Sequence, residues 1–210
     1  MATTPVIVST AVEGLIDEAV MRRLVSDAGA SVGPVYGKQG KRHLKRCSPG
    51  YNRAAYRLPW IVLVDLDRDA ECAPLLRSSW ATDLAPHMCF RVAVHEVEAW
   101  LMADREALAA FLGIPLAYVP MDPEAVHDPK ETMVALARRS RRRWIREDMV
   151  PRVGSGRSIG PAYTSRLIEF AETRWRPTVA AGRSDSLRRC GERLRALVQR
   201  WHAYPVSEGR

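Results

Sequence analysis

The sequence predicts an α/β fold with a parallel or mixed sheet flanked by helices, followed by a helical C-terminal elaboration. Four short apolar, β-branched segments lie within the first hundred residues. Segments with the 3.6-residue spacing of amphipathic helices separate them. Strands that alternate with helices are typical of sheets covered on both faces, whereas the rear of the chain shows only helical patterns.

The first half of the predicted core contains two strands and two helices. Pro5–Val12 is a β-branched apolar run, and Leu15–Ala28 has apolar residues on one helical face. Ser31–Tyr36 predicts a second strand. Gly37–Gly50 is rich in Gly and Lys and predicts a loop, which leads into a helix over Asn52–Arg57.

The second half contains the strongest strand signal. Pro59–Leu66 is a continuous apolar run of the kind found in central parallel strands. We expect a helix over Ala73–Ala85, a strand over Met88–His95 and one long helix over Val97–Leu112, which Gly113 ends.

Beyond this point the pattern becomes helical and rich in arginine. Prolines punctuate a loop after residue 114, and a helix begins near Lys130. Arg138–Arg146 holds six arginines in nine residues, broken by Trp144. Two further helices are predicted over Ala162–Trp175 and Ser184–Trp201.

The charge divides along the chain in the same way. The net charge is +8, of which residues 1–136 carry −3 and residues 137–210 carry +11. We therefore predict an α/β core over 1–136 and a basic helical region over 137–210 packed on it. A positive region favours polyanions, although only four of the 32 basic residues are Lys, and such a bias also arises in GC-rich genomes.

Several classes of protein are excluded by composition. An apolar content of 47% with 27% charged residues excludes a disordered chain. The purest apolar run, Trp60–Val64, is too short to span a membrane, and the N-terminus lacks the pattern of a secretory signal. The four cysteines form no CxxC pair, which argues against a zinc site. We expect a cytoplasmic protein with free thiols.

Acidic residues occur where the predicted strands end. Glu13 follows the first strand, Asp65 and Asp67 close the third, and Glu96 and Glu98 follow the fourth. Functional groups gather at the carboxyl ends of parallel strands, so we expect these carboxylates to meet at one edge of the sheet.

The spacing of these carboxylates indicates a metal site. Asp65 and Asp67 would share a face of an extended strand, where their repulsion calls for a cation such as Mg²⁺. Asp17 lies in the first turn of a predicted helix, where it joins the site or only complements the helix dipole. On a helix Glu96 and Glu98 point in different directions, and we favour Glu98 for the site, with Glu96 second.

Two other motifs begin in the same way. Asp65-x-Asp67-x-Asp69 starts like an EF-hand loop, but Ala70 stands where Gly is required and Leu76 where the bidentate Glu should be. Phosphatases with an aspartyl nucleophile also use D-x-D, usually after the first strand with Thr or Val two positions later. Here the motif follows the third strand and Asp69 occupies that position, so a phosphatase is the weaker alternative.

Glu13-Gly14-x-x-Asp17 followed by Asp65-x-Asp67 resembles the signature of the TOPRIM fold, the metal-binding α/β domain of topoisomerases, primases and several nucleases. Val94–Asp104 (VHEVEAWLMAD) is similar to a segment in a small bacterial family of unknown function related to the OLD-class (overcoming lysogenisation defect) nucleases. In that family a Pro-Lys pair follows, here Pro129-Lys130, and a later S-x-S segment corresponds to Ser184–Ser186. One departure is Ile16, where many relatives have Thr.

The resemblance implies a TOPRIM-like core, Mg²⁺ or Mn²⁺ binding and phosphodiester hydrolysis. It also implies a bacterial phage-defence or mobile-element setting, often beside an ATPase. On this basis Glu13, Asp65 and Asp67 would hold one ion, and Glu98 or Glu96, with Asp17, would help to hold a second. Lys130 would stabilise charge in the transition state, or is simply an exposed lysine at a helix start.

Basic residues in two segments are candidates for contacts with the phosphate backbone of a nucleic acid. They are Lys38, Lys41 and Arg42 in the predicted loop, and Arg138, Arg139, Arg142 and Arg143 in the arginine run. For the run, a solvated helix face or a partner site is an equal alternative. A non-catalytic nucleic-acid-binding or ATPase-partner subunit is accordingly the alternative to a nuclease.

Overall fold

The computed structural model describes residues 5–80 and 83–203 and contains a four-stranded parallel sheet. Its strands are β1 (Ile7–Val12), β2 (Ser31–Gly37), β3 (Trp60–Asp65) and β4 (Met88–Ala93), in the order β2-β1-β3-β4. All three pairings are parallel. The α/β class is therefore confirmed, as are the positions of all four predicted strands.

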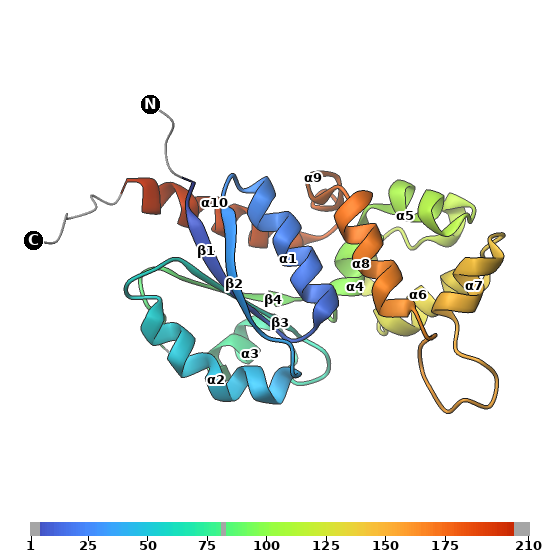
Figure 1. The fold of residues 1–210 in the computed structure, drawn as a ribbon, viewed down its shortest axis with the longest axis horizontal. Helices are drawn as coiled ribbons and strands as arrows, with labels where there is room; N and C mark the ends of the chain where they lie inside the picture. The colour runs from blue at the N-terminus through green and yellow to red at the C-terminus, as the bar shows by residue number, and fades with distance from the viewer. Residues whose placement is uncertain (1–4, 81–82, 204–210) are drawn as a thin grey trace, which may run out of the picture.

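Helices cover both faces of the sheet (Figure 1). On one face lie α1 (Leu15–Asp27) and α10 (Asp185–His202), whose apolar side chains join those of β1 and β3 in one core cluster. On the other face α2 (Lys41–Ala54) and α3 (Ala73–Trp80) enclose a second, smaller cluster. The apolar run of β3 belongs to both clusters, because a central strand is buried on both sides.

The remaining helices lie to one side of the sheet, next to the carboxyl ends of its strands (Figure 1). They are α4 (Val97–Ala103), α5 (Arg105–Leu112), α6 (Pro129–Arg138), α7 (Arg143–Met149), α8 (Tyr163–Thr173) and α9 (Pro177–Ala180), with two short 3₁₀ helices over Leu116–Tyr118 and Pro123–Ala125. Helix α8 packs against α1 and α10 against β4, so the helical region and the sheet share one core. The predicted boundary at residue 136 falls inside α6, and residues 204–210 of the predicted rear lie outside the described residues.

The prediction for residues 37–57 is wrong in its boundaries. Helix α2 begins at Lys41 and continues through Pro49 to Ala54, where a loop was expected. Its buried residue Leu44 belongs to the second core cluster. Burial against the sheet outweighs the weak intrinsic helix preference of a Gly- and Pro-containing segment.

The long helix predicted over Val97–Leu112 is in fact two helices. Asp104 leaves the helical conformation and accepts a hydrogen bond from the amide of Ala107, so it caps the start of α5. Helix α3 is described over Ala73–Trp80, residues 81–82 of the helix predicted to reach Ala85 lie outside the described residues, and residues 83–85 are not helical.

Trp100 anchors the helical region to the sheet. It is fully buried, and its indole Nε1 donates to the Ser186 hydroxyl of α10 at 2.7 Å. Its carbonyl accepts a bond from the indole of Trp175 at 3.2 Å. The C-terminal segment is therefore fixed to α4, immediately behind the carboxyl ends of the strands. Across the described part of the chain, no helix combines the length and the apolar character needed to cross a bilayer.

We predict that Asp104→Ala lowers the free energy of unfolding by about 2–4 kcal/mol. Asp104 is fully buried and receives three hydrogen bonds from Arg176, two of them from its guanidinium, in addition to capping α5. Urea denaturation followed by circular dichroism measures the change. Asp122→Ala is the matched control, because this exposed aspartate caps a 3₁₀ helix without an arginine partner and should cost about 1 kcal/mol or less. Equal effects of the two variants would contradict the role of the Arg176 pair.

Candidate functional site

Glu13, Asp65 and Asp67 link the ends of the strands through side-chain and backbone hydrogen bonds. The Glu13 carboxylate, just after β1, accepts a hydrogen bond from the amide of Asp65 at 2.9 Å. Asp65 ends β3, and its own carboxylate accepts from the amide of Val97 at the start of α4 at 3.1 Å. The amide of Asp67 in turn donates to the carbonyl of His95 after β4. Acidic groups distant in the sequence therefore meet at one edge of the sheet.

Two further carboxylates are buried next to this edge. Asp17, in the first turn of α1, is 5% exposed, and its Oδ1 has no hydrogen-bond partner in the described part of the chain. Glu98 is 2% exposed and accepts a hydrogen bond from the Tyr163 hydroxyl of α8 at 3.2 Å. The helix dipole stabilises negative charge in the first turn of α1 and of α4. This stabilisation is smaller than the free-energy cost of burying a charge that has no partner.

Burial raises the pKa of each of these groups. Loss of solvent raises the pKa of Glu13 to about 7, that of Glu98 to about 7 and that of Asp17 to about 6. The pKa of Asp65 lies well above its ordinary value, first because of burial and then because the charges of Asp17, Glu98, Glu13 and Asp67 surround it. The site thus holds more negative charge than its surroundings stabilise.

Two lysines supply the positive charge at the site. Lys41 of α2 contacts Asp67 at 2.6 Å and Asp69 at 2.7 Å, and lies 4.0 Å from Glu13. Lys130 of α6 contacts Glu96 at 2.7 Å, and its backbone amide donates to the same carboxylate. The charge of Lys130 also lowers the pKa of Glu98 and of Asp17, while the surrounding carboxylates raise the pKa of Lys130 itself.

The expectation that Asp65 and Asp67 share a strand face is wrong. The strand ends at Asp65, and Asp67 has a left-handed backbone with φ 49°. As a result Asp65 turns into the carboxylate cluster, whereas the Asp67 side chain is 41% exposed and held by Lys41.

Glu96 and Glu98 diverge because α4 begins between them. Glu96 is the N-cap residue, and its carboxylate binds Lys130 at the start of α6. Glu98 lies in the first turn and is directed into the buried cluster, where its charge and that of Asp65 repel each other. This is the arrangement that helical geometry predicts for residues two positions apart.

The donor set has the chemistry of a magnesium site, although its ligands are not assembled. All of these groups are carboxylates, the oxygen donors that Mg²⁺ and Mn²⁺ prefer, and the Oδ1 of Asp17 accepts no hydrogen bond from any described residue. Within residues 5–80 and 83–203, however, no three His, Cys, Asp or Glu side chains are already placed to hold a metal ion. Ion binding would require these side chains to move closer together.

The predicted phosphate-binding residues lie in different environments. Lys38 pairs with Glu18 at 3.0 Å, Lys41 belongs to the carboxylate site, and Arg42 is exposed. Arg138 lines a cavity of about 430 Å³ together with Glu96 and Lys130. Among these residues, Lys41 and Arg138 are therefore the basic groups placed next to the carboxylates.

The other arginines of the run make contacts within the protein. Arg139 lies over the Tyr118 ring at 4.7 Å, Arg142 donates to the carbonyl of Phe111 at 2.8 Å, and Arg143 pairs with Glu147 at 2.7 Å. These contacts stabilise the helical region.

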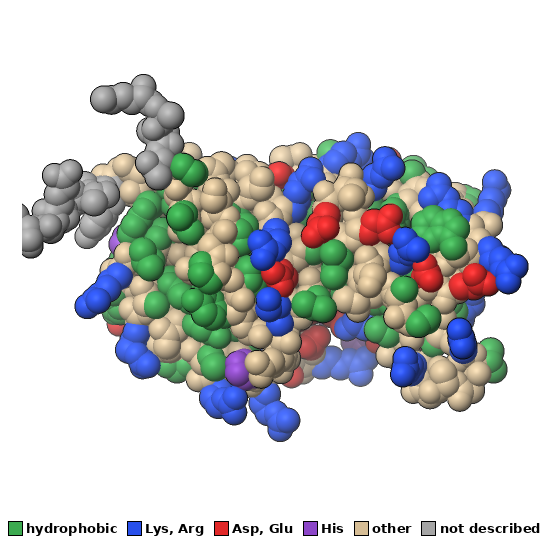
Figure 2. All heavy atoms as spheres, in the orientation of Figure 1, with side chains coloured by type: hydrophobic (Ala, Val, Ile, Leu, Met, Phe, Trp, Pro, Cys, Tyr) green, Lys and Arg blue, Asp and Glu red, His purple; other side chains and the backbone are tan. Residues whose placement is uncertain are grey.

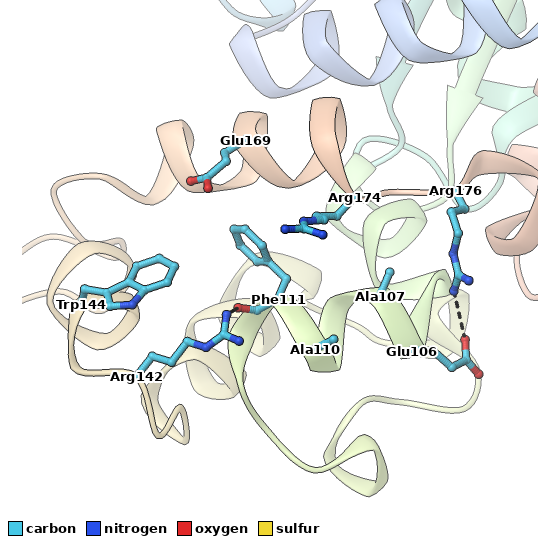
Figure 3. Close-up of a pocket in the computed structure, with 9 residues that line it drawn as sticks. All are labelled: Glu106, Ala107, Ala110, Phe111, Arg142, Trp144, Glu169, Arg174 and Arg176. Carbon is cyan, nitrogen blue, oxygen red and sulfur yellow. Dashed lines mark hydrogen bonds and ion pairs between the residues drawn. The ribbon is translucent and has the colours of Figure 1, made fainter.

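A cavity of about 630 Å³ lies in the helical region (Figure 3). It is formed by α5, α8 and the start of α7, and is lined by Phe111, Trp144, Arg142 and Arg174 among others. None of the predicted metal ligands lines it, and the Trp144 ring is already covered by the Arg166 guanidinium at 4.5 Å. This cavity is therefore distinct from the carboxylate cluster.

Some residues of the site were missed in the sequence. Tyr163 reaches Glu98 from α8, 65 positions away, and Asp69 shares Lys41 with Asp67. Nothing in the local pattern around Tyr163 marks it as a site residue. The D-x-D-x-D spacing was a usable signal for Asp69.

No family model, no curated protein and no solved structure matches this chain. The resemblance to TOPRIM nucleases stays a prediction from the motifs.

We predict that Asp17→Asn stabilises the metal-free protein by about 1–3 kcal/mol at pH 8, because it removes a buried negative charge whose pKa is raised to about 6. Chemical denaturation in the presence of EDTA measures the gain. Glu18→Gln is the matched control on the next residue. Glu18 is paired with Arg22 and Lys38, which lower its pKa, so its neutralisation should give no gain. A loss of stability in Asp17→Asn would contradict the charge imbalance.

The stability of the metal-free protein should fall as the pH rises from 5.5 to 8. In the folded protein Glu13 and Glu98 keep their protons up to about pH 7, whereas in the unfolded chain they lose them near 4.5. The folded state therefore binds more protons in this window, and each rise in pH favours unfolding. We expect a melting temperature at least about 4 °C lower at pH 8. The difference should shrink in the double variant Glu13→Gln/Glu98→Gln, and a melting temperature that rises with pH would refute the assignment.

Proposed function

We propose that the protein is a divalent-metal-dependent nuclease that hydrolyses phosphodiester bonds. The observation that carries the proposal is the cluster of Glu13, Asp17, Asp65 and Glu98 at the carboxyl ends of the strands, where burial raises every carboxylate pKa. Such a concentration of negative charge costs stability unless a cation offsets it. A TOPRIM-like role in a bacterial phage-defence or mobile-element setting, in the cytoplasm, agrees with the sequence motifs.

The residues have separable roles in this proposal. Glu13, Asp65 and Asp67 would hold one Mg²⁺ or Mn²⁺, and Glu98 with Asp17 or Glu96 would contribute to a second. When bound, such ions supply activation of water and neutralisation of the charge on the reacting phosphate. Tyr163 orients Glu98 through its hydroxyl, and the amide of Val97 orients Asp65.

Lys130 has the properties of an electrostatic stabiliser. Neighbouring carboxylates raise its pKa, so it stays protonated and does not act as a base. Its ammonium lies beside the cluster, in contact with Glu96 and at the wall of the cavity that also contains Arg138. A phosphate in that cavity would meet both positive charges.

A second candidate function is a non-catalytic nucleic-acid-binding or ATPase-partner subunit. The observation that favours it is that Lys41 and Lys130 already neutralise part of the cluster, while no three ligands are assembled in the described part of the chain. In this role the lysines would supply part of the compensating charge, and a bound cation would stabilise the fold without taking part in catalysis.

We predict that the purified protein cleaves labelled DNA or RNA in Mg²⁺ or Mn²⁺ and that EDTA abolishes cleavage. Asp65→Asn and Glu13→Gln should each lower the rate by at least about 100-fold, because they remove a ligand at the centre of the site. Lys130→Ala should lower kcat with little change in KM. Glu71→Gln, an exposed acidic residue between β3 and α3, is the control and should keep its activity.

Thermal denaturation separates the two candidate functions. A rise in melting temperature with Mg²⁺ that Asp65→Asn removes, together with cleavage, supports the nuclease. The same rise without cleavage of single- or double-stranded DNA or RNA supports the non-catalytic subunit. If Mg²⁺ does not raise the melting temperature and no cleavage occurs, the proposed metal site is overturned.

A further inference from the structure

The outer edge of β4 is an unpaired strand edge. Among the described residues, β4 is the last strand of the sheet and pairs only with β3. In that ladder the amides of Trp60 and Leu66 donate to the carbonyls of His87 and Ala93, so the odd-numbered residues of β4 bond to β3. The amide and carbonyl groups of Phe90 and Val92 must therefore face away from the sheet.

The outward groups of Phe90 and Val92 lie between two backbone amides that do have hydrogen-bond acceptors. The amide of Met88 donates to the carbonyl of Ala85, and the amide of Val94 donates to the Ser186 hydroxyl. For Phe90 and Val92 no outward partner occurs within residues 5–80 and 83–203. Both residues are nearly buried, at 5% and 6% exposure, where unpaired backbone groups cost free energy.

A groove of about 670 Å³ runs along this edge between α3 and α10. One wall is apolar and consists of Phe90 and Val92 with Ala73 and Pro74 of α3. The even-numbered side chains of β4 belong to the core cluster on this face, and the odd-numbered ones face α10. The two walls of the groove therefore lie above and below an open strand edge.

The α10 wall carries both signs of charge, and its arginines outnumber the acidic residues Glu124, Asp185 and Glu192 that also line it. Arg188, Arg189 and Arg193 of α10 line it with Arg91 of β4, and Arg77 of α3 lies at the rim of the opposite wall. Arg188 and Arg189 are held by Asp185 and Glu192. Arg77, Arg91 and Arg193, by contrast, form no ion pair with another described residue, and the buried Nε of Arg91 lacks a hydrogen-bond partner there.

We propose that this groove binds an acidic, extended segment of a partner protein, which adds to β4 as a fifth strand. The main-chain groups of Phe90 and Val92 would pair with the backbone of the segment. Side chains on a strand alternate between faces, so alternate residues would meet the apolar α3 wall and the arginines of the α10 wall. The segment should therefore alternate acidic and apolar residues.

A peptide fits this groove better than a nucleic acid strand. A nucleic acid would satisfy the arginines, but it has no row of alternating amide and carbonyl groups to match Phe90 and Val92. The groove also shares no lining residue with the proposed metal ligands, so partner binding and catalysis are separate properties.

The test uses the full chain and the fluorescein-labelled heptapeptide EVEVEVE in fluorescence anisotropy. The controls are EEEEVVV, which has the same composition without alternation, and KVKVKVK. We expect EVEVEVE to bind at least about tenfold more tightly than either control, because only it matches both walls. Equal binding of EVEVEVE and EEEEVVV, or no binding of EVEVEVE, would overturn the proposal.

Substitutions of residues that line the groove test whether the peptide binds there. Arg77→Ala/Arg193→Ala should weaken binding of EVEVEVE about tenfold, whereas Arg195→Ala, exposed on α10 but not lining the groove, should leave it unchanged. Val92→Pro removes the outward amide and leaves the ladder to β3 in place, so it should abolish binding while the circular dichroism spectrum is retained. If that variant fails to fold, the difference in peptide affinity between Arg77→Ala/Arg193→Ala and Arg195→Ala still tests whether the peptide binds in the groove. An oligothymidine that binds through Arg77 and Arg193 in place of the peptide would refute the proposal and indicate a nucleic-acid surface.

Discussion

The burial of several carboxylates at the carboxyl ends of four parallel strands is the constraint on which the rest of the structure depends. Asp65 lies among Asp17, Glu98, Glu13 and Asp67, and each of these charges raises its pKa. The surrounding elements are arranged to offset this charge. Helix α2 supplies Lys41, α6 supplies Lys130 and α8 supplies the Tyr163 hydroxyl. The mutual repulsion within this cluster is the basis of our proposal that the protein binds a divalent cation.

The basic region over residues 137–210 has two structural roles that are independent of any contact with a polyanion. Helix α10 covers one face of the sheet and receives the Trp100 indole, and α8 covers α1. Figure 2 shows that Lys and Arg side chains on this face of the helical half are interspersed with Asp and Glu, while hydrophobic side chains gather over the sheet half. Part of the +11 excess is therefore balanced locally by ion pairs such as those of Arg176 and Arg188. Arg77 and Arg193 line the β4 groove and Arg138 lines the cavity near Lys130, where we propose that they contact external anions.

Much of the fold could be predicted because its strands are short, apolar and well separated. The run Trp60–Val64 left no alternative to a central strand, and the acidic residues that follow β1, β3 and β4 indicated where a site would form. Local helix propensity gave the wrong helix boundaries at two places, because tertiary contacts determine the boundaries there. Pro49 remained inside α2 because the helix packs on the sheet, and Asp104 divided α4 from α5 because Arg176 and the amide of Ala107 both bind its carboxylate.

By itself the sequence determined the class of the fold, the order of its strands along the chain and the residues that would meet at the carboxyl edge, since each follows from a local period of two or 3.6 residues. Only the tertiary structure decided what those residues do there. It turned Asp67 away from Asp65 through a left-handed backbone and paired Glu96 with Lys130 and Glu98 with Tyr163. Among the described residues it placed no hydrogen-bond partner next to the Oδ1 of Asp17. The free edge of β4 between α3 and α10 was equally invisible in the sequence. Burial, pairing and charge balance depend on contacts between distant segments, and no local pattern records them.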